Sequence, residues 1–297
     1  MRVLISGASG FLGQRLTRAL REASHEAVAL VRRQAQGDEV LWDPGQPLDP
    51  ARLAGCDAIV HLAAKNISGL WTQKFKEELL NSRVRGTRTL AIAAAESFRR
   101  TGRPRIFISA SGDRFYGDRG DEVLTEESSA GKGFLSEVAQ QWEAATAPAS
   151  DAGLRVVCLR IGVVLGRDGG ALKPMLLPFR LGLGGRIGSG KQYMSWIALE
   201  DVIGAISFAL EQENVRGPVN LVGPSPVRNE EFVRALGRVL HRPTIFPMPE
   251  FVVRTVFREM GQELLLTSVR ALPEKLQAAG YRFCYEGLED ALRAALR

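Results

Sequence analysis

The chain has few of the residues that build metal sites or disulfide scaffolds. It contains only three cysteines and three histidines in 297 residues. Cys56, Cys158 and Cys284 lie far apart, with no CxxC pair and no Cys/His cluster. We therefore predict no metal site and expect a reducing compartment. No run of 18 or more apolar residues occurs, so no membrane span is predicted. Because Gly7 precedes any signal-peptide core, we expect a cytoplasmic protein.

The chain also lacks a concentrated charge of one sign. Lys and Arg number 39 against 33 Asp and Glu, a net charge of +6. The basic residues are scattered, whereas nucleic-acid-binding proteins gather them in a patch or stripe. We expect a small-molecule substrate, no nucleic-acid or membrane partner, and a monomer or homodimer. Hydrophobic residues make up 45% of the chain, which is enough for a sizeable core.

Short apolar runs alternate with helical patterns in the first half of the chain. The predicted strands are Val3–Ser6, Ala27–Val31, Asp57–Leu62, Ile106–Ser109 and Leu154–Leu159. The predicted helices between and beside them are Gln14–Ala23, Gln73–Arg100 and Phe134–Ala147. Strands that alternate with helices indicate βαβ units with right-handed crossovers. The expected fold is α/β, with a Rossmann-type doubly wound parallel sheet.

The pattern changes after about Val164. Glycine-rich loops are expected from Gly166 to Gly190, and Asp201–Leu210 and Val219–Val222 return to the first domain. The later predicted helices are Glu230–Leu240, Phe251–Arg258, Pro273–Ala279 and Leu288–Leu296. The sequence therefore predicts a Rossmann domain of residues 1–165 plus 199–225. Residues 166–198 plus 226–297 form a smaller, mostly helical substrate domain.

A glycine-rich segment with Gly7, Gly10 and Gly13 follows the first strand and opens the first helix. In such a segment the first glycine allows a tight turn, the second admits a pyrophosphate, and the third lets the helix pack on the sheet. The helix N-terminus adds free N–H groups and roughly half a positive charge. A dinucleotide site is predicted here, against the alternative of a purely structural turn.

The end of the second strand indicates which dinucleotide binds. An acidic residue there would bind a ribose 2′-hydroxyl and favour NAD. Instead, Arg32 and Arg33 follow Val31. Two guanidinium groups suit a 2′-phosphate through charge-assisted, bidentate contacts. The alternative is an ordinary solvated pair of arginines, and we predict NADP as the cofactor.

Several motifs carry a family resemblance. They include His61–Ala64, Asn81–Thr87, Ser109–Ser111 with Tyr116-Gly117, Leu159–Gly166, Leu177–Gly185, Gly188–Ile197 and Ala279–Phe283. Together with the glycine segment, they resemble the extended short-chain dehydrogenase/reductase superfamily. The resemblance is to its atypical, NAD(P)-dependent epimerase-like family with a C-terminal helical extension. Members of that family are labelled sugar-nucleotide epimerases or cell-division inhibitors.

The resemblance implies a set of cofactor contacts. The pyrophosphate would lie on Ser9, Phe11 and Leu12 together with the three glycines, and the 2′-phosphate on Arg32 and Arg33. The remaining implied contacts are Leu62 and Ala63 beside the adenosine and pyrophosphate, Glu78 and Arg83 on the long helix, and Ile161 and Val163 beside the nicotinamide.

The usual catalytic pair of the superfamily is missing. Its members use a tyrosine followed four residues later by a lysine, which lowers the phenol pKa from ~10. None of the four tyrosines has a lysine at that spacing, and Leu135 and Ala139 stand near the expected places. Ser111 and Tyr116 are the predicted catalytic residues. Asp113 and Lys132 are further candidates for the proton, although each of these groups also suits a purely structural loop.

Two functions remain open. The first is an NADP-dependent oxidoreductase or epimerase acting on a small substrate that is anionic or linked to a nucleotide. The second is a catalytically inactive NADP(H)-binding protein that uses the cofactor as a structural or redox-sensing ligand and regulates a partner. The glycine segment and Arg32-Arg33 support both, whereas the missing Tyr–Lys pair favours the second.

Overall fold

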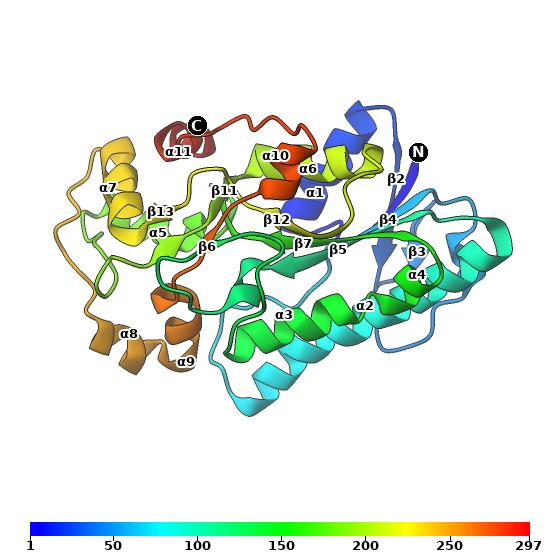
Figure 1. The fold of residues 1–297 in the computed structure, drawn as a ribbon, viewed down its shortest axis with the longest axis horizontal. Coiled ribbons are helices and arrows are strands. Elements are labelled where there is room, and N and C mark those ends of the chain that lie inside the picture. Colours follow the sequence, from blue (N-terminus) through cyan, green and yellow to red (C-terminus); the bar gives the residue numbers. More distant parts are fainter.

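The computed structural model describes all 297 residues and is built around one seven-stranded sheet (Figure 1). The strand order is β12-β7-β5-β4-β1-β2-β3, and every neighbouring pair is parallel. The strands are β1 (Arg2–Ser6), β2 (Glu26–Val31), β3 (Val40–Leu41), β4 (Ala58–His61), β5 (Ile106–Gly112), β7 (Arg155–Ile161) and β12 (Gly217–Leu221). This arrangement confirms the predicted Rossmann-type sheet.

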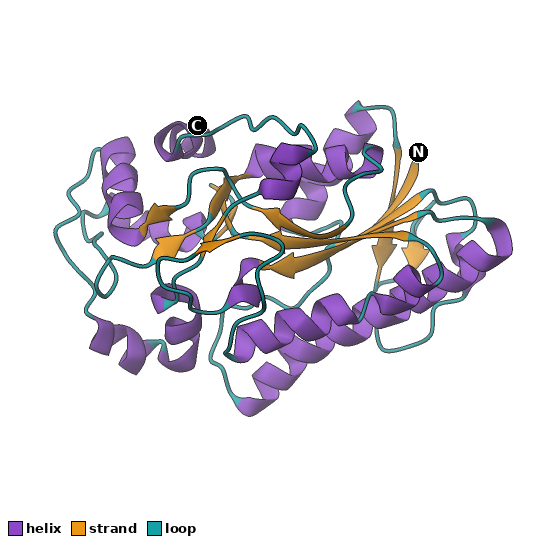
Figure 2. Ribbon diagram, viewed as in Figure 1, coloured by secondary structure: helices purple, strands orange, loops and turns teal.

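Helices cover both faces of the sheet (Figure 2). One face carries α1 (Phe11–Glu22) and α6 (Leu199–Glu211), and the other carries α2 (Gln73–Thr101), α3 (Phe134–Ala144) and α4 (Ala147–Asp151). Side chains of β1 alternate between the two cores, as strand geometry requires. Val3 and Ile5 pack in the core beneath α1 and α6, and Leu4 packs in the core beneath α2.

A smaller part of the molecule lies beyond the carboxyl edge of the sheet (Figure 1). It has its own core, in which Leu172, Trp196, Phe232 and Leu292 are buried together. Its helices are α5 (Leu172–Arg180), α7 (Asn229–Leu240), α8 (Glu250–Val256), α9 (Arg258–Gly261) and α11 (Leu288–Leu296). The helix α10 (Glu274–Ala278) instead packs against β12 of the large sheet, and Leu276 is buried in the sheet core. The short strands are β6 (Val123–Leu124), β8 (Val163–Gly166), β9 (Gly169–Gly170), β10 (Tyr193–Met194), β11 (Trp196–Ala198), β13 (Val227–Arg228) and β14 (Arg270–Ala271). The domain boundaries given above stay a prediction.

Two predicted elements differ in the structure. The predicted helix Phe134–Ala147 ends at Ala144, and α4 begins separately at Ala147. Pro148 lies in the first turn of α4, and its missing N–H cannot continue the helix before it. The glycine-rich stretch 166–190, predicted as loops, contains the helix α5. In the helices of the structure we find no apolar stretch long enough to cross a bilayer.

Candidate functional site: a glycine turn at the carboxyl edge

The turn after β1 leaves no room for a side chain at Gly7 or Gly13. Gly7 has φ of +71°, and a Cβ there would lie 2.9 Å from the backbone nitrogen of Ala63. A Cβ on Gly13 would collide with the carbonyl oxygen of Gly7. These two glycines therefore let α1 begin directly against the end of the sheet, as the sequence predicts.

The N-terminus of α1 is open to an anion. Gly10 precedes the helix, no side chain caps it, and no acidic residue lies in the first turn. The N–H groups of Phe11, Leu12 and Gly13 have no acceptor within the helix, because the carbonyls that would pair with them lie before it. Ser9 and Gly10 are exposed. Free donors, an aligned helix dipole and an exposed turn fit a pyrophosphate.

The end of β4 is fixed against this turn by a buried hydrogen-bond cluster. The Ser6 hydroxyl lies 2.6 Å from Nδ1 of His61 and accepts the N–H groups of Leu62 and Ala63 at 3.2 and 3.3 Å. Burial lowers the pKa of His61 to about 4, so its imidazole is neutral at pH 7. Ser6 and His61 thus hold the predicted contact residues Leu62 and Ala63 beside Gly7.

Arg32 and Arg33 follow β2, as predicted, and both are exposed. The two differ in their pairing. Arg33 donates from its two terminal nitrogens to Glu39 at 2.8 and 2.6 Å, and this hydrogen bonding lowers the pKa of the Glu39 carboxyl. Arg32 makes no ion pair or side-chain hydrogen bond. Arg32 is thus free for a phosphate, whereas Arg33 shares its charge with a carboxylate.

The two predicted residues on α2 both face Lys65, in the loop after β4. The Glu78 carboxylate binds the Lys65 ammonium at 2.6 Å. The buried Arg83 donates to the carbonyl oxygens of Lys65 and Leu79 at 3.1 and 3.2 Å, and burial lowers its pKa to about 10. Glu78 and Arg83 therefore fix the loop that leads away from Ala63, and their direct contact with a cofactor stays a prediction.

Ile161 and Val163 lie at the carboxyl end of β7 and at the start of β8, and both are half-buried. Ile161 stands opposite Gly112 of β5 in the sheet register. Gly112 directly precedes Asp113, so the candidate proton donors after β5 lie beside the strand that is predicted to flank the nicotinamide.

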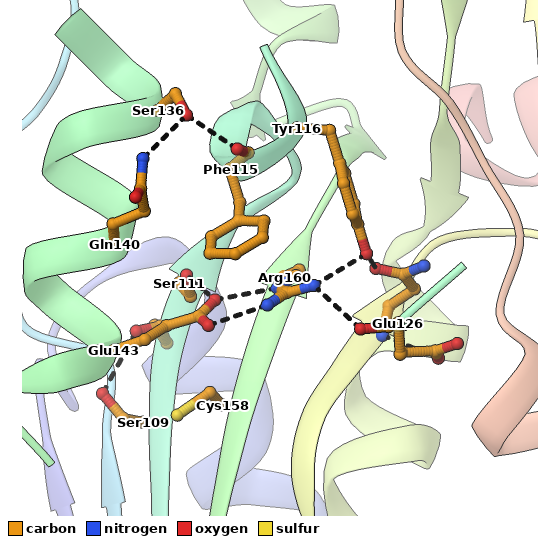
Figure 3. Close-up of polar contacts among 12 residues, drawn as sticks. Ser109, Ser111, Phe115, Tyr116, Glu126, Ser136, Gln140, Glu143, Cys158 and Arg160 are labelled. Atoms are coloured by element: carbon orange, nitrogen blue, oxygen red, sulfur yellow. Dashed lines mark hydrogen bonds and ion pairs between the residues drawn. The ribbon is translucent and has the colours of Figure 1, made fainter. Parts of the chain in front are cut away.

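Ser111 belongs to a buried polar network with Glu143 of α3 and Arg160 of β7 (Figure 3). Its hydroxyl donates to Oε1 of Glu143 at 2.8 Å. Arg160 donates from Nε and Nη2 to the two oxygens of the same carboxylate at 2.9 and 3.0 Å. The sequence reasoning missed this ion pair, although an arginine on a buried strand requires a partner.

Tyr116 lies on the other side of Arg160 and is fully buried (Figure 3). Its hydroxyl donates to Oδ1 of Asn220 at 2.6 Å and accepts from Nη1 of Arg160 at 2.9 Å. Burial raises the pKa of Tyr116 to about 12. This geometry does not favour the catalytic role predicted for Tyr116, because its proton is held by a buried acceptor, Oδ1 of Asn220.

The helix α3 contains neither a tyrosine nor a lysine. Leu135 and Ala139 are buried on it. The N-terminus of α3 is instead occupied by Glu263, whose carboxylate accepts the N–H groups of Phe134 and Leu135 at 3.3 Å each. Glu263 comes from the turn 262–266 after α9, a contact that sequence spacing does not reveal. Lys132 is exposed.

The fold and the glycine turn define a dinucleotide-binding protein of the Rossmann class. The family described as "NAD dependent epimerase/dehydratase family" matches residues 3–223, and "Domain of unknown function (DUF1731)" matches residues 248–295. This chain therefore belongs to the NAD-dependent epimerase/dehydratase family, which confirms the resemblance drawn from its motifs.

Relatives match the chain from end to end. "Epimerase family protein MT2273" of Mycobacterium tuberculosis is 44% identical over 98% of this chain and 96% of its own length. "Epimerase family protein SDR39U1" of Homo sapiens is 38% identical over 99% of both chains.

Two solved structures share both sequence and fold with this chain. The crystal structure of human SDR39U1 (isoform 2) with NADPH superposes with a TM-score of 0.90, at 37% identity, over 99% of this chain and 98% of the human one. The crystal structure of a nucleoside-diphosphate sugar epimerase from Corynebacterium glutamicum superposes with a TM-score of 0.82 at 37% identity. The match covers 100% of this chain and 58% of the Corynebacterium chain. The human protein thus holds the cofactor that the glycine turn and Arg32-Arg33 predict here.

Proposed function

We propose that this chain binds NADP(H) and is an oxidoreductase or epimerase that acts on the carbonyl or hydroxyl group of a small substrate. The open N-terminus of α1 behind Gly7 carries the proposal, because its N–H groups have no other acceptor. The human relative crystallised with NADPH supports the same cofactor.

Different residues of the chain would bind different parts of the cofactor. The α1 N-terminus and the turn Gly7–Gly10 would hold the pyrophosphate, and Arg32 and Arg33 the 2′-phosphate. Leu62 and Ala63 would line the adenosine side, and Ile161 and Val163 the nicotinamide side. When bound, the nicotinamide supplies or accepts a hydride. The chain orients the substrate and moves the accompanying proton.

The alternative is an NADP(H)-binding protein without turnover. One observation supports it, namely that Leu135 and Ala139, which stand near the places expected for the proton-transferring pair of the superfamily, are buried apolar residues on α3. A regulatory protein would respond to NADPH yet leave every carbonyl substrate unchanged.

A binding measurement tests the cofactor first. A ligand present at 100 times its dissociation constant stabilises a protein by about 2.7 kcal/mol. We therefore expect NADPH to raise the melting temperature more than NADH does, and Arg32→Asp to remove this preference. Equal shifts with both dinucleotides would contradict the proposed 2′-phosphate site.

A turnover measurement then separates the two functions. The protein is mixed with NADPH and a panel of simple aldehydes, ketones and nucleoside-diphosphate sugars, and nicotinamide absorbance is followed. Isomerisation of the sugars is followed in parallel by chromatography. NADPH oxidation or isomerisation that depends on one substrate class supports the enzyme, and NADPH binding without either supports the regulatory protein.

A further inference from the structure

Asp113 is a buried carboxyl group with one oxygen, Oδ2, for which the fold provides no hydrogen-bond partner. Only 8% of its side chain is exposed, and Oδ2 is fully enclosed without a donor. Buried polar atoms are almost always hydrogen-bonded, so each exception requires an explanation. Glu143 is bound by Arg160, and Glu263 by the N–H groups of α3. Glu126 also has a buried oxygen without a partner, Oε2, but its Oε1 accepts the backbone N–H of Asn220 at 3.0 Å.

The guanidinium of Arg114 beside it is also incompletely satisfied. Its Nη2 donates to the carbonyl oxygen of Leu264 at 3.2 Å, but its Nη1 is buried without a partner and lies 3.9 Å from Oδ2 of Asp113. At 3.9 Å the two groups attract each other without forming a hydrogen bond. Two buried polar atoms without hydrogen-bond partners, Oδ2 of Asp113 and Nη1 of Arg114, therefore lie next to each other.

The pair lies at the carboxyl edge of the sheet, next to the strand proposed to flank the nicotinamide. Asp113 is the first residue after β5, one step beyond the pair Gly112–Ile161. In open parallel sheets, ligands bind beyond the carboxyl ends of the strands. The residues 262–266 cross over this end of β5, through the contact of Leu264 with Arg114 and of Glu263 with α3. Asp113 and Arg114 are thus enclosed between the Rossmann sheet and the C-terminal part of the chain.

The surroundings favour a carboxyl group that keeps its proton. Burial raises the pKa of Asp113, and the charge of Arg114 together with a backbone hydrogen bond only partly opposes this rise. From the neighbouring elements, Arg160 and Glu143 are paired with each other, and Glu263 is engaged at the N-terminus of α3. Arg114 is therefore the one charged neighbour that acts on Asp113.

We propose that Asp113 is the proton donor that replaces the missing tyrosine, and that Arg114 stabilises the oxygen that receives the proton. This proposal rests on the proposed function, with a carbonyl compound as the substrate class. In reduction, the carbonyl carbon gains a hydride from NADPH, which becomes NADP⁺. The carbonyl oxygen takes the proton of the Asp113 carboxyl, and the resulting carboxylate regains a proton from water.

The first test needs no turnover. Carbon-13 carboxyl NMR of aspartate-labelled protein, with and without NADPH, follows every aspartate across pH 3–9. The resonance that is absent from Asp113→Asn is that of Asp113, with Asp113→Ser as a second variant should the first not fold. Because burial raises the pKa of Asp113, we expect it to titrate at a higher pH than the exposed aspartates of the same protein. Titration near the ordinary aspartate value of about 3.9 would overturn the proposal, because an ionised carboxylate has no proton to give.

The second test uses any carbonyl compound that the wild-type protein reduces. Loss of a general acid costs about 10²- to 10⁴-fold in rate. We expect a loss of that size in kcat for Asp113→Asn, with the dissociation constant of NADPH unchanged within twofold. Asp113→Glu, which keeps a carboxyl group, should have a kcat between those of Asp113→Asn and the wild type. The control is Asp290→Asn, since Asp290 is an exposed aspartate on α11.

The outcomes separate this inference from the proposed function. If the wild-type protein reduces a carbonyl and Asp113→Asn keeps its rate and pH profile, Asp113 is not the donor although the protein is an enzyme. If no carbonyl is reduced, the oxidoreductase function fails, and the NMR titration alone decides whether Asp113 holds a proton at pH 7.

Discussion

Arg33 binds the carboxylate of Glu39 with both of its terminal nitrogens, at 2.8 and 2.6 Å, at the edge where the 2′-phosphate of NADP is proposed to lie. The carboxylate comes from the loop that leads from β2 to β3. An acidic group at this position neutralises one of the two arginines and repels a phosphate. We therefore predict that this pair weakens the preference of the protein for NADP over NAD.

Removing the charge of Glu39 is expected to strengthen NADPH binding. Because exposed ion pairs are weak, Glu39→Gln should lower the dissociation constant of NADPH by about twofold to fivefold. NADH, which has no 2′-phosphate, should bind unchanged. Isothermal titration calorimetry with both dinucleotides measures the difference. Weaker NADPH binding in Glu39→Gln would mean that Glu39 positions Arg33 for the phosphate.

The glycine turn can be tested with two alanine variants that share one backbone conformation. Gly7 and Gly102 both have φ of +71°, but only Gly7 has neighbouring atoms where the Cβ would lie. Each substitution should cost about 1–2 kcal/mol for the left-handed backbone. Gly7→Ala should in addition abolish the thermal shift produced by NADPH, and Gly102→Ala should keep it. An unchanged NADPH shift in Gly7→Ala would contradict the pyrophosphate site.

The buried pair Arg160–Glu143 is expected to stabilise the fold strongly. The side chains are only 4% and 14% exposed, and removal of one partner leaves a buried charge without its partner. Breaking such a pair costs about 3–5 kcal/mol, and we expect this loss for Glu143→Ala in urea unfolding. The exposed pair Arg254–Glu250 on α8 provides the control, since Glu250→Ala should cost about 1 kcal/mol or less. Similar losses in both variants would contradict the role given to Arg160.

The stability of the protein should fall on acidification because of His61. Burial lowers its pKa to about 4 from the ordinary histidine value of 6.5, so the unfolded chain binds a proton more readily than the folded one. The stabilisation is present above pH 6.5 and is lost as the pH falls towards 4. Over that window it amounts to about 3 kcal/mol.

The measurement compares unfolding free energies at several pH values for the wild type and His61→Asn. We expect a shallower pH dependence in the variant. Substitution of the exposed His241 by asparagine controls for the loss of an imidazole elsewhere. Identical acid slopes for the wild type and His61→Asn would show that His61 is not the group that titrates.

The glycine segment was predictable because its chemistry is local. Gly7, Gly10 and Gly13 lie within seven residues, and the strand before them and the helix after them follow from short-range patterns. The helix α5 was not predicted, since the glycines on either side of Leu172–Arg180 obscure a short helix whose apolar side pairs with α7 only in the folded chain. The break between α3 and α4 was not predicted either, although Pro148 in the sequence indicates it.

The sequence alone determined the Rossmann sheet, the dinucleotide turn, the arginine pair after β2 and the absence of the Tyr–Lys pair, because each depends on residues close together in the chain. Tertiary structure decided how the candidate groups at the end of β5 are hydrogen-bonded. Tyr116 and Ser111 are held by Asn220 and Glu143, which come from distant elements, whereas Asp113 is buried with an oxygen that nothing satisfies. Burial and hydrogen bonding are set by segments that meet only on folding, and no spacing in the sequence reports them.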